Sequence, residues 1–481
     1  MKDSNDKLMD KIISLCKRRG FIFPGSEIYG GLQNSWDFGP LGVALKKNIK
    51  AEWWKRFVQN REDIVGLDAA ILMNPKVWEA SGHSETFSDP LVECKECHTR
   101  FRLDENGKSQ APSTKSQINS PPKADPPLAG NGQSGKCPNC GKENLTEAQD
   151  FNLMLKTSLG ATEGKGSEVY FRPETAQGIF VNFKNILNTT RKRIPFGIAQ
   201  IGKAFRNEIT PGNFIFRTRE FEQMEIEYFV REDEWESWFT HWLDQIKQWN
   251  VDLGLDDGDL EYVEVSEDER AHYSKRTVDI EYKFPFGQKE LYGLAYRTDH
   301  DLKAHIDVSG EDLKYMNPDD SKDRFVPHVI EPSFGVERTV LAVMLSAYRE
   351  ENISSQNSNN QAPNNNGAEE ENDVRVILKF PYWVAPVKVA VLPLMKKDGM
   401  GEKAKEVFDV LKLEFDCEYD ESGSIGKRYR RQDEIGTPFC VTIDHDTLEN
   451  DSVTVRDRDS LEQERVAIAD LAGYISGKLN K

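Results

Sequence analysis

Hydrophobic residues recur at helical spacing near the N-terminus and in long alternating runs further along the chain. Pro40 suits the first turn of a helix, and Leu41, Leu45, Ile49 and Trp53 follow four residues apart, which predicts an amphipathic helix. The apolar face of that helix is explained equally well by packing against the protein core and by binding to a partner. The alternating runs and scattered helices before residue 352 predict an α+β domain built on an antiparallel sheet.

The pattern changes after residue 373. Residues 387–394, 438–444 and 452–456 predict strands, whereas residues 400–415 and 461–479 predict helices. Strands and helices that alternate over about 100 residues indicate a small α/β domain with a mostly parallel sheet.

Two polar segments lie outside both patterns, at about 104–136 and 352–373. Neither holds enough apolar surface to offset the entropy of ordering, so both are predicted to be flexible. The first interrupts a domain, and the second resembles a linker. We therefore predict a domain at 1–351 with an insertion at about 94–150, a linker at 352–373 and a second domain at 374–481.

Composition indicates a cytoplasmic globular enzyme. The 481 residues exceed one ordinary core, and they are 38% hydrophobic and 30% charged. No apolar run approaches the ~18 residues of a membrane span, and the N-terminus lacks a signal peptide's apolar centre. The net charge of −18 does not exclude a nucleic-acid partner, because an acidic protein can carry a local basic groove.

Four of the seven cysteines form two Cys-x-x-Cys pairs, Cys94 with Cys97 and Cys137 with Cys140. Thiols stay reduced in the cytoplasm, so these are metal ligands or buried thiols rather than disulfides. Two such pairs are typical of a zinc knuckle with four thiolate ligands. Most of the gap is the polar insertion, and loop closure becomes costly only slowly with length. We predict a structural Zn²⁺ site.

Residues 204–229 carry the first candidate chemistry. Phe205-Arg206-Asn207-Glu208 leads to a turn near Pro211-Gly212, and a second strand follows. With a period of two, one face of that strand carries Arg217, Arg219, Phe221, Gln223, Glu225 and Glu227. Arginine forks neutralise phosphates and an aromatic ring stacks on a base, so this face suits a nucleotide triphosphate beside a small cation. A solvated charged hairpin explains the pattern equally well.

Residues 329–338 carry the second candidate chemistry. They predict a strand that ends at Glu331 and a helix that begins near Phe334, with Val336 on its buried face. Arg338 lies roughly 200° round the helix from Val336 and so points away from that face. An arginine in a first turn opposes the helix dipole but suits a bound anion.

These two stretches resemble motifs 2 and 3 of the class II aminoacyl-tRNA synthetases, and the helix after Pro40, with the stretch through Pro75, resembles motif 1. The chain is similar to the glycyl-specific members of this family over nearly its whole length. The segments that carry this similarity are Gly30-Gly31-Leu32-Gln33, Asp37-Phe38-Gly39-Pro40-Leu41-Gly42, Ala80-Ser81-Gly82-His83, Arg172-Pro173-Glu174-Thr175-Ala176-Gln177-Gly178 and Glu331-Pro332-Ser333-Phe334-Gly335.

The resemblance implies a homodimeric enzyme that activates glycine with ATP and Mg²⁺ and then loads it onto tRNA. Arg206 would hold the α-phosphate, Arg338 the γ-phosphate and adenine side, and Glu290 would help to hold ATP and its Mg²⁺. Arg206 and Arg338 would be the catalytic residues. The implied ATP-binding residues are Arg206, Asn207, Glu208, Phe216, Arg217, Thr218, Arg219, Glu220, Phe221, Glu290, Leu291, Gly335, Val336, Glu337 and Arg338.

The resemblance also implies a glycine pocket, in which acidic side chains hold the ammonium group. The implied glycine-binding residues are Arg100, Glu174, Phe221, Glu222, Gln223, Met224, Glu225, Glu331, Pro332, Ser333, Phe334 and Gly335. In the second domain, the basic run with an aromatic ring resembles the anticodon-binding surface of the family, suited to phosphate contacts and stacking. Its implied tRNA-binding residues are Lys427, Arg428, Arg430 and Arg431.

Two alternatives remain on the sequence alone. A non-catalytic nucleic-acid-binding relative could keep this fold, but retention of Arg206, Arg217, Phe221 and Arg338 argues against it. A class II synthetase for another small amino acid is the nearer alternative, and the glycyl-specific segments argue against that one.

Overall fold

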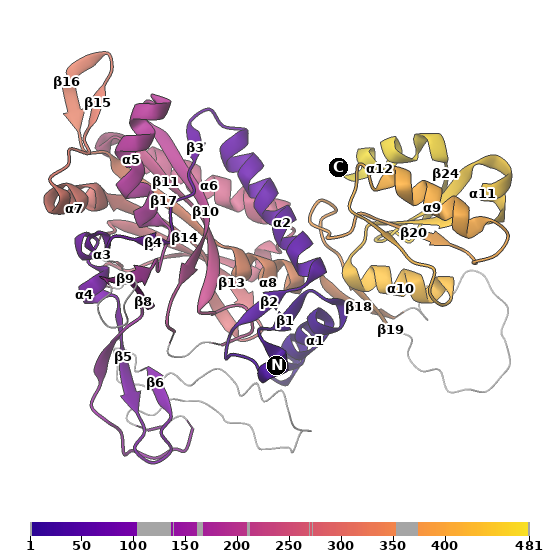
Figure 1. Cartoon of the computed structure of the whole chain (residues 1–481), viewed down its shortest axis with the longest axis horizontal. Helices are drawn as coiled ribbons and strands as arrows, with labels where there is room; N and C mark the ends of the chain where they lie inside the picture. Colours follow the sequence, from indigo (N-terminus) through magenta and orange to yellow (C-terminus); the bar gives the residue numbers. More distant parts are fainter. Residues whose placement is uncertain are drawn as a thin grey trace.

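The computed structural model describes residues 2–102, 136–137, 139–160, 167–208, 212–268, 270–271, 273–352 and 374–479. The predictions for 104–136 and 352–373 fall almost entirely outside these residues. Figure 1 shows two lobes, a larger one up to residue 352 and a smaller one from residue 374. Within the described ranges, no helix has both the length and the apolar character needed to cross a bilayer.

A seven-stranded sheet forms the centre of the larger lobe. Its order is β12-β13-β14-β17-β11-β10-β3, and every neighbouring pair is antiparallel except β10 with β3. This confirms the predicted α+β fold on an antiparallel sheet. In that order the strands are β12 (Leu260–Glu264), β13 (Arg276–Phe284), β14 (Gly287–Thr298), β17 (His328–Gly335), β11 (Glu220–Val230), β10 (Phe196–Phe205) and β3 (Ile64–Gly66).

Helices cover both faces of this sheet because its strands alternate between two cores. On β11, Met224, Ile226 and Tyr228 point into the main core, whereas Phe229 packs with Phe180 and other rings on the opposite face. The main core is built with α1 (Lys2–Arg19), α2 (Pro40–Trp54), α6 (Trp235–Asp252) and α8 (Val336–Ala347), and the opposite face with α5 (Ala176–Thr190) and α7 (His300–Ser309).

Helix α2 begins as the sequence predicts, with Pro40 in its first turn, and continues into a π-helical turn at Lys55–Gln59. It buries Leu45, Ile49 and Trp53, so core packing accounts for its apolar face. Gly42 is required by close approach, since a Cβ there would lie 1.9 Å from the carbonyl oxygen of Phe21.

Smaller elements surround the sheet. An arm formed by β5 (Ser88–Glu93), β6 (Arg100–Arg102) and β7 (Gln149–Asn152) extends from the bottom of the lobe in Figure 1, and the hairpin of β15 (Tyr315–Asn317) and β16 (Asp320–Phe325) projects at the top. The others are β1 (Ile22–Pro24), β2 (Trp36–Phe38), β4 (Leu72–Met73), α3 (Pro75–Ala80), α4 (His83–Thr86), β8 (Lys156–Leu159) and β9 (Ser167–Phe171).

The smaller lobe is an α/β unit, but its sheet is mixed rather than mostly parallel as predicted. The strand order is β21-β20-β22-β23-β24, parallel across the first three strands and antiparallel across the rest. The elements are β20 (Val389–Pro393), α9 (Met400–Leu411), β21 (Cys417–Tyr419), α10 (Ile425–Ile435), β22 (Phe439–Ile443), α11 (His445–Asn450), β23 (Ser452–Asp457), β24 (Gln463–Ala467) and α12 (Leu471–Leu479).

The prediction of one closing helix over 461–479 is wrong in its first half. The side chain of Asp457 accepts hydrogen bonds from the backbone N–H groups of Asp459 and Ser460, each at 2.9 Å, and this turn reverses the chain. The residues that follow therefore pair as β24 against β23, and the helix begins only at Leu471.

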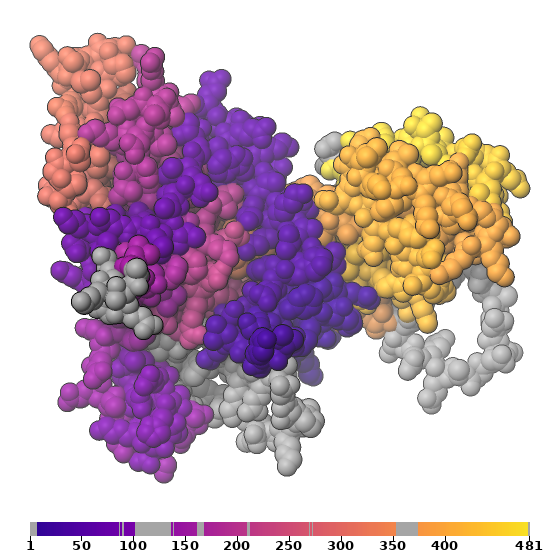
Figure 2. All heavy atoms as spheres, in the orientation of Figure 1, coloured from indigo at the N-terminus to yellow at the C-terminus, as the bar shows by residue number. Residues whose placement is uncertain are grey.

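Backbone pairing, an ion pair and apolar packing join the two lobes, and Leu378, Phe380 and Ile435 belong to the same hydrophobic cluster as the main core. A two-stranded sheet of β18 (Tyr348–Asn352) and β19 (Val374–Leu378) connects them, and Arg375 on β19 donates to Asp433 on α10 at 2.7 Å. Asp433 also pairs with Arg456, and all three side chains are buried. Beside it on α10, Glu434 pairs with Arg19 of α1. Figure 2 shows the smaller lobe meeting the larger one beside the N-terminal residues.

Candidate active site

An open pocket lies on the face of the large sheet that carries α5 and α7. It is formed by the loop between β10 and β11, the start of β11, the end of β17 and the first turn of α8. Its lining residues are Arg206, Glu208, Ile215, Phe216, Arg217, Thr218, Phe221, Gln223, Glu290, Leu291, Ser333, Gly335, Glu337 and Arg338. Most of the residues implied to bind ATP are thus brought together.

The loop between β10 and β11 is held by its own backbone and by buried rings. The N–H of Arg206 donates to the carbonyl of Arg219 at 2.9 Å, directly after β10 ends at Phe205. The rings of Phe214 and Phe216 are both buried, against Trp36 and Phe284 respectively. Phe214, Ile215 and Phe216 are buried one after another, and Asn213 and Phe214 have positive φ, so this segment cannot follow the alternation of a strand. The second strand consequently begins at Glu220 and not before Arg217 as predicted.

Arg338 projects from the first turn of α8, away from the buried helix face, as its position relative to Val336 predicts. One guanidinium nitrogen lies 2.9 Å from the carbonyl oxygen of Glu290 and 3.2 Å from its carboxylate, and the group lies 4.5 Å from the ring of Phe216. The charge of Arg338 lowers the pKa of Glu290. The preceding strand continues to Gly335, four residues beyond the predicted end at Glu331.

Arg206 lies on the other side of the pocket. Its guanidinium donates to the carbonyl of Pro173 at 2.9 Å and lies 5.3 Å from the ring of Phe221 and 5.2 Å from that of Phe87. Arg217 lines the same pocket, 4.0 Å from the carboxylate of Glu208. Three arginines, Arg206, Arg217 and Arg338, therefore face one open space, an arrangement that suits the oxygens of a polyphosphate.

Below the arginines, acidic side chains fill the interior of the sheet face. Glu225 accepts hydrogen bonds from Ser333 at 2.8 Å and Gln223 at 3.2 Å, and from the hydroxyl of Thr175. Glu331 accepts from Arg297 at 2.8 Å. The same guanidinium makes two hydrogen bonds to Asp301, each of 2.8 Å.

Glu174 closes this acidic group from the segment before α5. Its carboxylate lies 3.4 Å from His83 and accepts from Gln177 at 3.1 Å. Burial opposes ionisation of Glu174, but the charges of His83 and Arg297 hold its pKa below the usual value. Burial raises the pKa of Glu331 to about 8, against the effect of Arg297 and reinforced by Glu225 and Glu174. Acidic side chains therefore outnumber basic ones in the pocket, and a small cation would favour their ionised forms.

Several implied glycine-binding residues lie on the wrong face for that role. Glu222 pairs with Lys46 and Lys50 of α2, and Met224 and Phe334 are buried in the main core. The cause is the alternation of β-strand side chains, which sends even-numbered residues of β11 and β17 away from the pocket. Pro332 alternates in the same way, so none of these four side chains can line the glycine pocket.

Some implied ATP-binding residues also lie outside the lining. Arg219 donates to the carbonyl of Gln33 at 3.0 Å, and Glu220 pairs with Lys203 on the opposite face. Asn207 makes a backbone hydrogen bond to Leu153, and Val336 is buried in the core. Arg100 is exposed on the arm, where it pairs with Glu93 at 2.8 Å, and the structure does not bring it to the pocket.

The structure also adds residues that the sequence does not single out. Arg297 and Asp301 are buried at the base of the pocket, and neither lies in a recognisable motif. Thr175, Gln177 and His83 belong to segments already quoted for the resemblance, and that signal could have identified them. Glu227, noted only as part of the alternating strand face, is fully buried beside Glu225.

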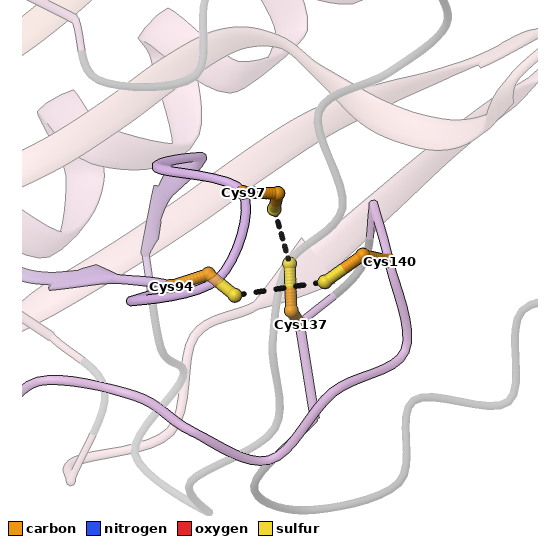
Figure 3. A group of neighbouring side chains, drawn as sticks. All are labelled: Cys94, Cys97, Cys137 and Cys140. Atoms are coloured by element: carbon orange, nitrogen blue, oxygen red, sulfur yellow. Dashed lines mark hydrogen bonds between the residues drawn. The ribbon is translucent and has the colours of Figure 1, made fainter.

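The four predicted metal ligands converge at the end of the arm (Figure 3). The Cys94 and Cys140 sulfurs lie 3.6 Å apart, those of Cys97 and Cys137 lie 3.5 Å apart, and the four sulfur atoms all lie within 4.8 Å of one another. In each pair, the backbone N–H four residues on donates to the carbonyl of the first cysteine. A tetrahedral zinc–thiolate centre with ~2.3 Å bonds would place its sulfurs ~3.8 Å apart, so this geometry fits zinc.

The predicted tRNA-binding run lies on α10, and its arginines differ in environment. Lys427 and Arg430 are exposed. Arg428 is only 2% exposed and donates to the carbonyls of Pro393 and Leu394, so the prediction that it contacts tRNA is wrong. Arg431 is half-buried, and its guanidinium is held by Asp420. Helical periodicity explains the difference, because residues three or four apart share a face: Arg428 is buried together with Gln432, and Lys427 is exposed together with Arg430.

An antiparallel sheet with three arginines over a buried acidic pocket, joined to a mixed α/β lobe, defines a class II aminoacyl-tRNA synthetase. Residues 160–348 match the tRNA synthetase class II core domain (G, H, P, S and T), and residues 388–478 match the anticodon binding domain. A prolyl-tRNA synthetase from Cryptosporidium parvum, complexed with L-proline and AMP, shares the fold. It has a TM-score of 0.60 at 13% identity, covering 98% of this chain and 77% of that chain.

Sequence relatives are closer. Glycine--tRNA ligase from Clostridium acetobutylicum is 53% identical over the full length of both chains. The enzymes from Acetivibrio thermocellus and Bacillus cereus are 52% and 50% identical, each over 98% of this chain and 99% of their own. The chain belongs to the glycine--tRNA ligase family.

The position of Arg338 generates a first prediction. Arg338→Ala should reduce ATP–pyrophosphate exchange by about a thousandfold or more, since it removes a fixed charge from the phosphate side of the pocket. Arg349→Ala, an exposed arginine beyond α8, is the matched control and should leave exchange unchanged. Near-normal exchange in a folded Arg338→Ala protein would contradict the role.

Proposed function

We propose that this site activates glycine with ATP and transfers the glycyl group to the 3′ end of tRNA. One observation carries the proposal: on a single sheet face, an arginine-lined pocket opens directly above a buried acidic pocket. A polyphosphate suits the first and an ammonium group the second. Substrate binding in both would bring the glycine carboxylate toward the phosphates.

The first step is adenylate formation. A carboxylate oxygen of glycine attacks the α-phosphorus of ATP, the bond to the bridging oxygen breaks, and diphosphate leaves. Arg206, fixed by Pro173 and placed against Phe221, stabilises charge at the α-phosphate. Arg217 and Arg338 hold the remaining phosphates. No covalent enzyme intermediate is required, since positioning and neutralisation suffice for phosphoryl chemistry.

ATP in this class is bound with Mg²⁺, and the pocket fits that ion through the exposed carboxylate of Glu290. Carboxylate oxygens are the ligands that Mg²⁺ prefers. Arg338 keeps Glu290 ionised by lowering its pKa. Bound Mg²⁺ would supply further neutralisation of the phosphates. In the second step, the terminal hydroxyl of tRNA attacks the glycyl carbonyl, and AMP leaves.

We propose that selection of glycine rests on the acidic side chains of this pocket and on a wall at Ser333. Glu174, Glu225 and Glu331 provide acceptors for the ammonium, and Ser333 is fixed by its hydrogen bond to Glu225. Missing contacts to a substrate side chain change the relative binding free energy by only ~1–3 kcal/mol per methylene. A packed wall discriminates more strongly, because any group added at the α-carbon would be forced against it and strained. Alanine and serine would meet that wall.

This pocket generates a second prediction. Glu225→Gln and Glu331→Gln should each raise the KM for glycine by about thirtyfold or more, because each removes a buried charge opposite the ammonium. The KM for ATP should change far less. Glu311→Gln, an exposed carboxylate paired with Lys184, is the control. Equal effects on both substrates would remove these residues from the glycine pocket.

We further propose that residues 374–481 form the anticodon-binding domain and that Lys427 and Arg430 contact tRNA phosphates. Both project from the exposed face of α10, whereas Arg428 and Arg431 are held within the lobe. We also propose a cytoplasmic location, where thiols stay reduced and the cysteines of the arm remain available to a metal.

The third prediction tests that surface. Reversing both charges, Lys427→Glu with Arg430→Glu, should raise the KM for tRNA about tenfold. The plot of log K for tRNA binding against log salt concentration should also become shallower, by the equivalent of about two phosphate contacts. Glycine-dependent exchange should be unaffected. Lys247→Glu with Lys283→Glu makes the same charge change on α6 and β13 and should leave tRNA affinity intact. If both pairs act alike, the effect is global charge and not a contact.

We propose a structural zinc ion at the four cysteines. The sulfur separations and the two matching turns support it. The fourth prediction is about one zinc per chain by elemental analysis of protein purified without added metal. Cys97→Ser should lose the metal and Cys417→Ser should keep it. A metal-free wild-type protein of full stability would show that the cysteines hold none.

We propose a homodimer that uses the segment before α2. Ile28 and Tyr29 are 88% and 87% exposed, and Leu32 is also exposed. Apolar side chains gathered in one short exposed segment mark an interaction surface. The fifth prediction is that Ile28→Glu with Tyr29→Glu shifts the sedimenting species from dimer to monomer, while Val410→Glu, an exposed apolar site on α9, does not. A monomeric wild-type protein would contradict the proposal.

A further inference from the structure

Glu227 occupies an unusual position at the base of the acidic pocket. It lies on β11 two residues beyond Glu225, and its exposed fraction is 0%. Neither carboxyl oxygen has a hydrogen-bond partner among the described residues. The other buried carboxylates of the pocket are all engaged, which makes Glu227 the exception.

Its surroundings explain why no donor reaches it. On β10 the residue directly opposite is Ile198, and the next residue on the same face of β11 is Phe229. Both belong to the apolar cluster that includes Phe180 and Phe183 of α5. Glu227 therefore stands at the boundary between this apolar cluster and the acidic pocket.

The charged neighbours of Glu227 are mostly negative. One carboxylate oxygen from each of Glu225, Glu227 and Glu331 lies within 4.8 Å of the others. Asp301 of α7 and Glu174 before α5 add to this charge. The guanidinium of Arg297 on β14 is the cation nearest this group, and its hydrogen bonds go to Asp301 and Glu331.

An ionised carboxylate without a donor in such a place is strongly disfavoured. Burial raises the pKa of Glu227 well above its usual value, and the charge of Glu331 raises it further. Arg297 opposes this shift, while Glu225 and Asp301 reinforce it. In the empty pocket, Glu227 is therefore a neutral carboxylic acid.

We propose that Glu227 is a positioning residue of the glycine pocket, which carries a proton while the pocket is empty and releases it when the substrate's ammonium group enters. The proposal rests on the glycine pocket described above and adds an exchange of charge to it. The ammonium supplies the positive charge that the three carboxylates lack, so that all three can be ionised together.

The exchange is balanced. Glycine enters as the zwitterion and keeps its three N–H bonds, the O–H bond of Glu227 breaks, and the proton passes to the solvent. Because the free site holds one more proton than the occupied site, glycine affinity increases as pH rises, up to the pKa of Glu227 in the free site. A residue that only fills space would produce no such dependence.

The test measures protons released on binding. Calorimetric titrations in buffers of different ionisation enthalpy would use glycylsulfamoyl-adenosine as the probe. The glycolyl analogue, which replaces the ammonium with a hydroxyl group, is the matched ligand control. Near pH 7, the wild-type chain should release at least one proton more with the glycyl probe than with the control, because Glu331, whose pKa is also raised, can add to the release from Glu227. Equal release for the two probes would overturn the proposal.

Glu227→Gln keeps the shape of the side chain and removes its titration. In this variant the extra release should decrease by about one proton. The decrease of the KM for glycine with rising pH should become shallower by up to about tenfold per pH unit, while the pH dependence of the KM for ATP should not change. Glu311→Gln should behave as the wild type. A Glu227→Gln protein whose extra release does not decrease would assign the exchange elsewhere and overturn the proposal.

The two hypotheses can fail separately. If Glu225→Gln and Glu331→Gln raise the KM for glycine no more than that for ATP, the glycine pocket itself is refuted. If those variants behave as expected and the wild type releases no extra proton, only the role of Glu227 falls. If Glu227→Gln does not fold, the comparison of the two probes on the wild-type chain still decides the question.

Discussion

The register of β11 against β17 is the constraint on which the rest of the structure depends. Glu225 stands opposite Ser333, and Tyr228 stands opposite Ile330. One set of side chains thereby forms the acidic pocket, and the other forms the core under α2 and α8. A shift of one residue would exchange the two sets, placing carboxylates in the core and aromatic rings in the pocket. Fold stability and substrate chemistry are thus tied to the same hydrogen-bond ladder.

The acidic pocket on this sheet contains more acidic side chains than Arg297 can neutralise. Five acidic side chains surround Arg297, and its guanidinium satisfies two of them directly. This excess of acidic groups costs free energy while the site is empty, because some of them must stay protonated or repel one another, and a bound cation would remove that cost. Part of the affinity for the substrate is therefore generated by relieving a cost built into folding.

The sequence predicts the antiparallel sheet, helix α2 and the placement of Arg206, Arg217 and Arg338, because local periodicity and motif spacing determine them. Its period of two also groups Phe221, Gln223 and Glu225 on one face of β11, and that is the face of the pocket. The glycine-binding residues implied by the resemblance come from both faces, because a motif includes every residue of a strand, so Glu222 and Met224 were wrongly included. Arg297 and Asp301 were missed because their partners lie on other strands and helices. Arg428 was misassigned because a basic run does not reveal which of its residues a helix buries.

Helix α10 is fastened near its C-terminal end by neighbouring residues, Asp433 to Arg375 and Arg456, and Glu434 to Arg19. The other end, with Lys427 and Arg430, points outward from these anchors. Of these contacts only Glu434 to Arg19 crosses to the larger lobe, and together with the pairing of β18 with β19 it limits how far α10 can move relative to the catalytic pocket. A partner that contacts both lobes must therefore match the distance between them, and little binding free energy is lost in arranging the lobes.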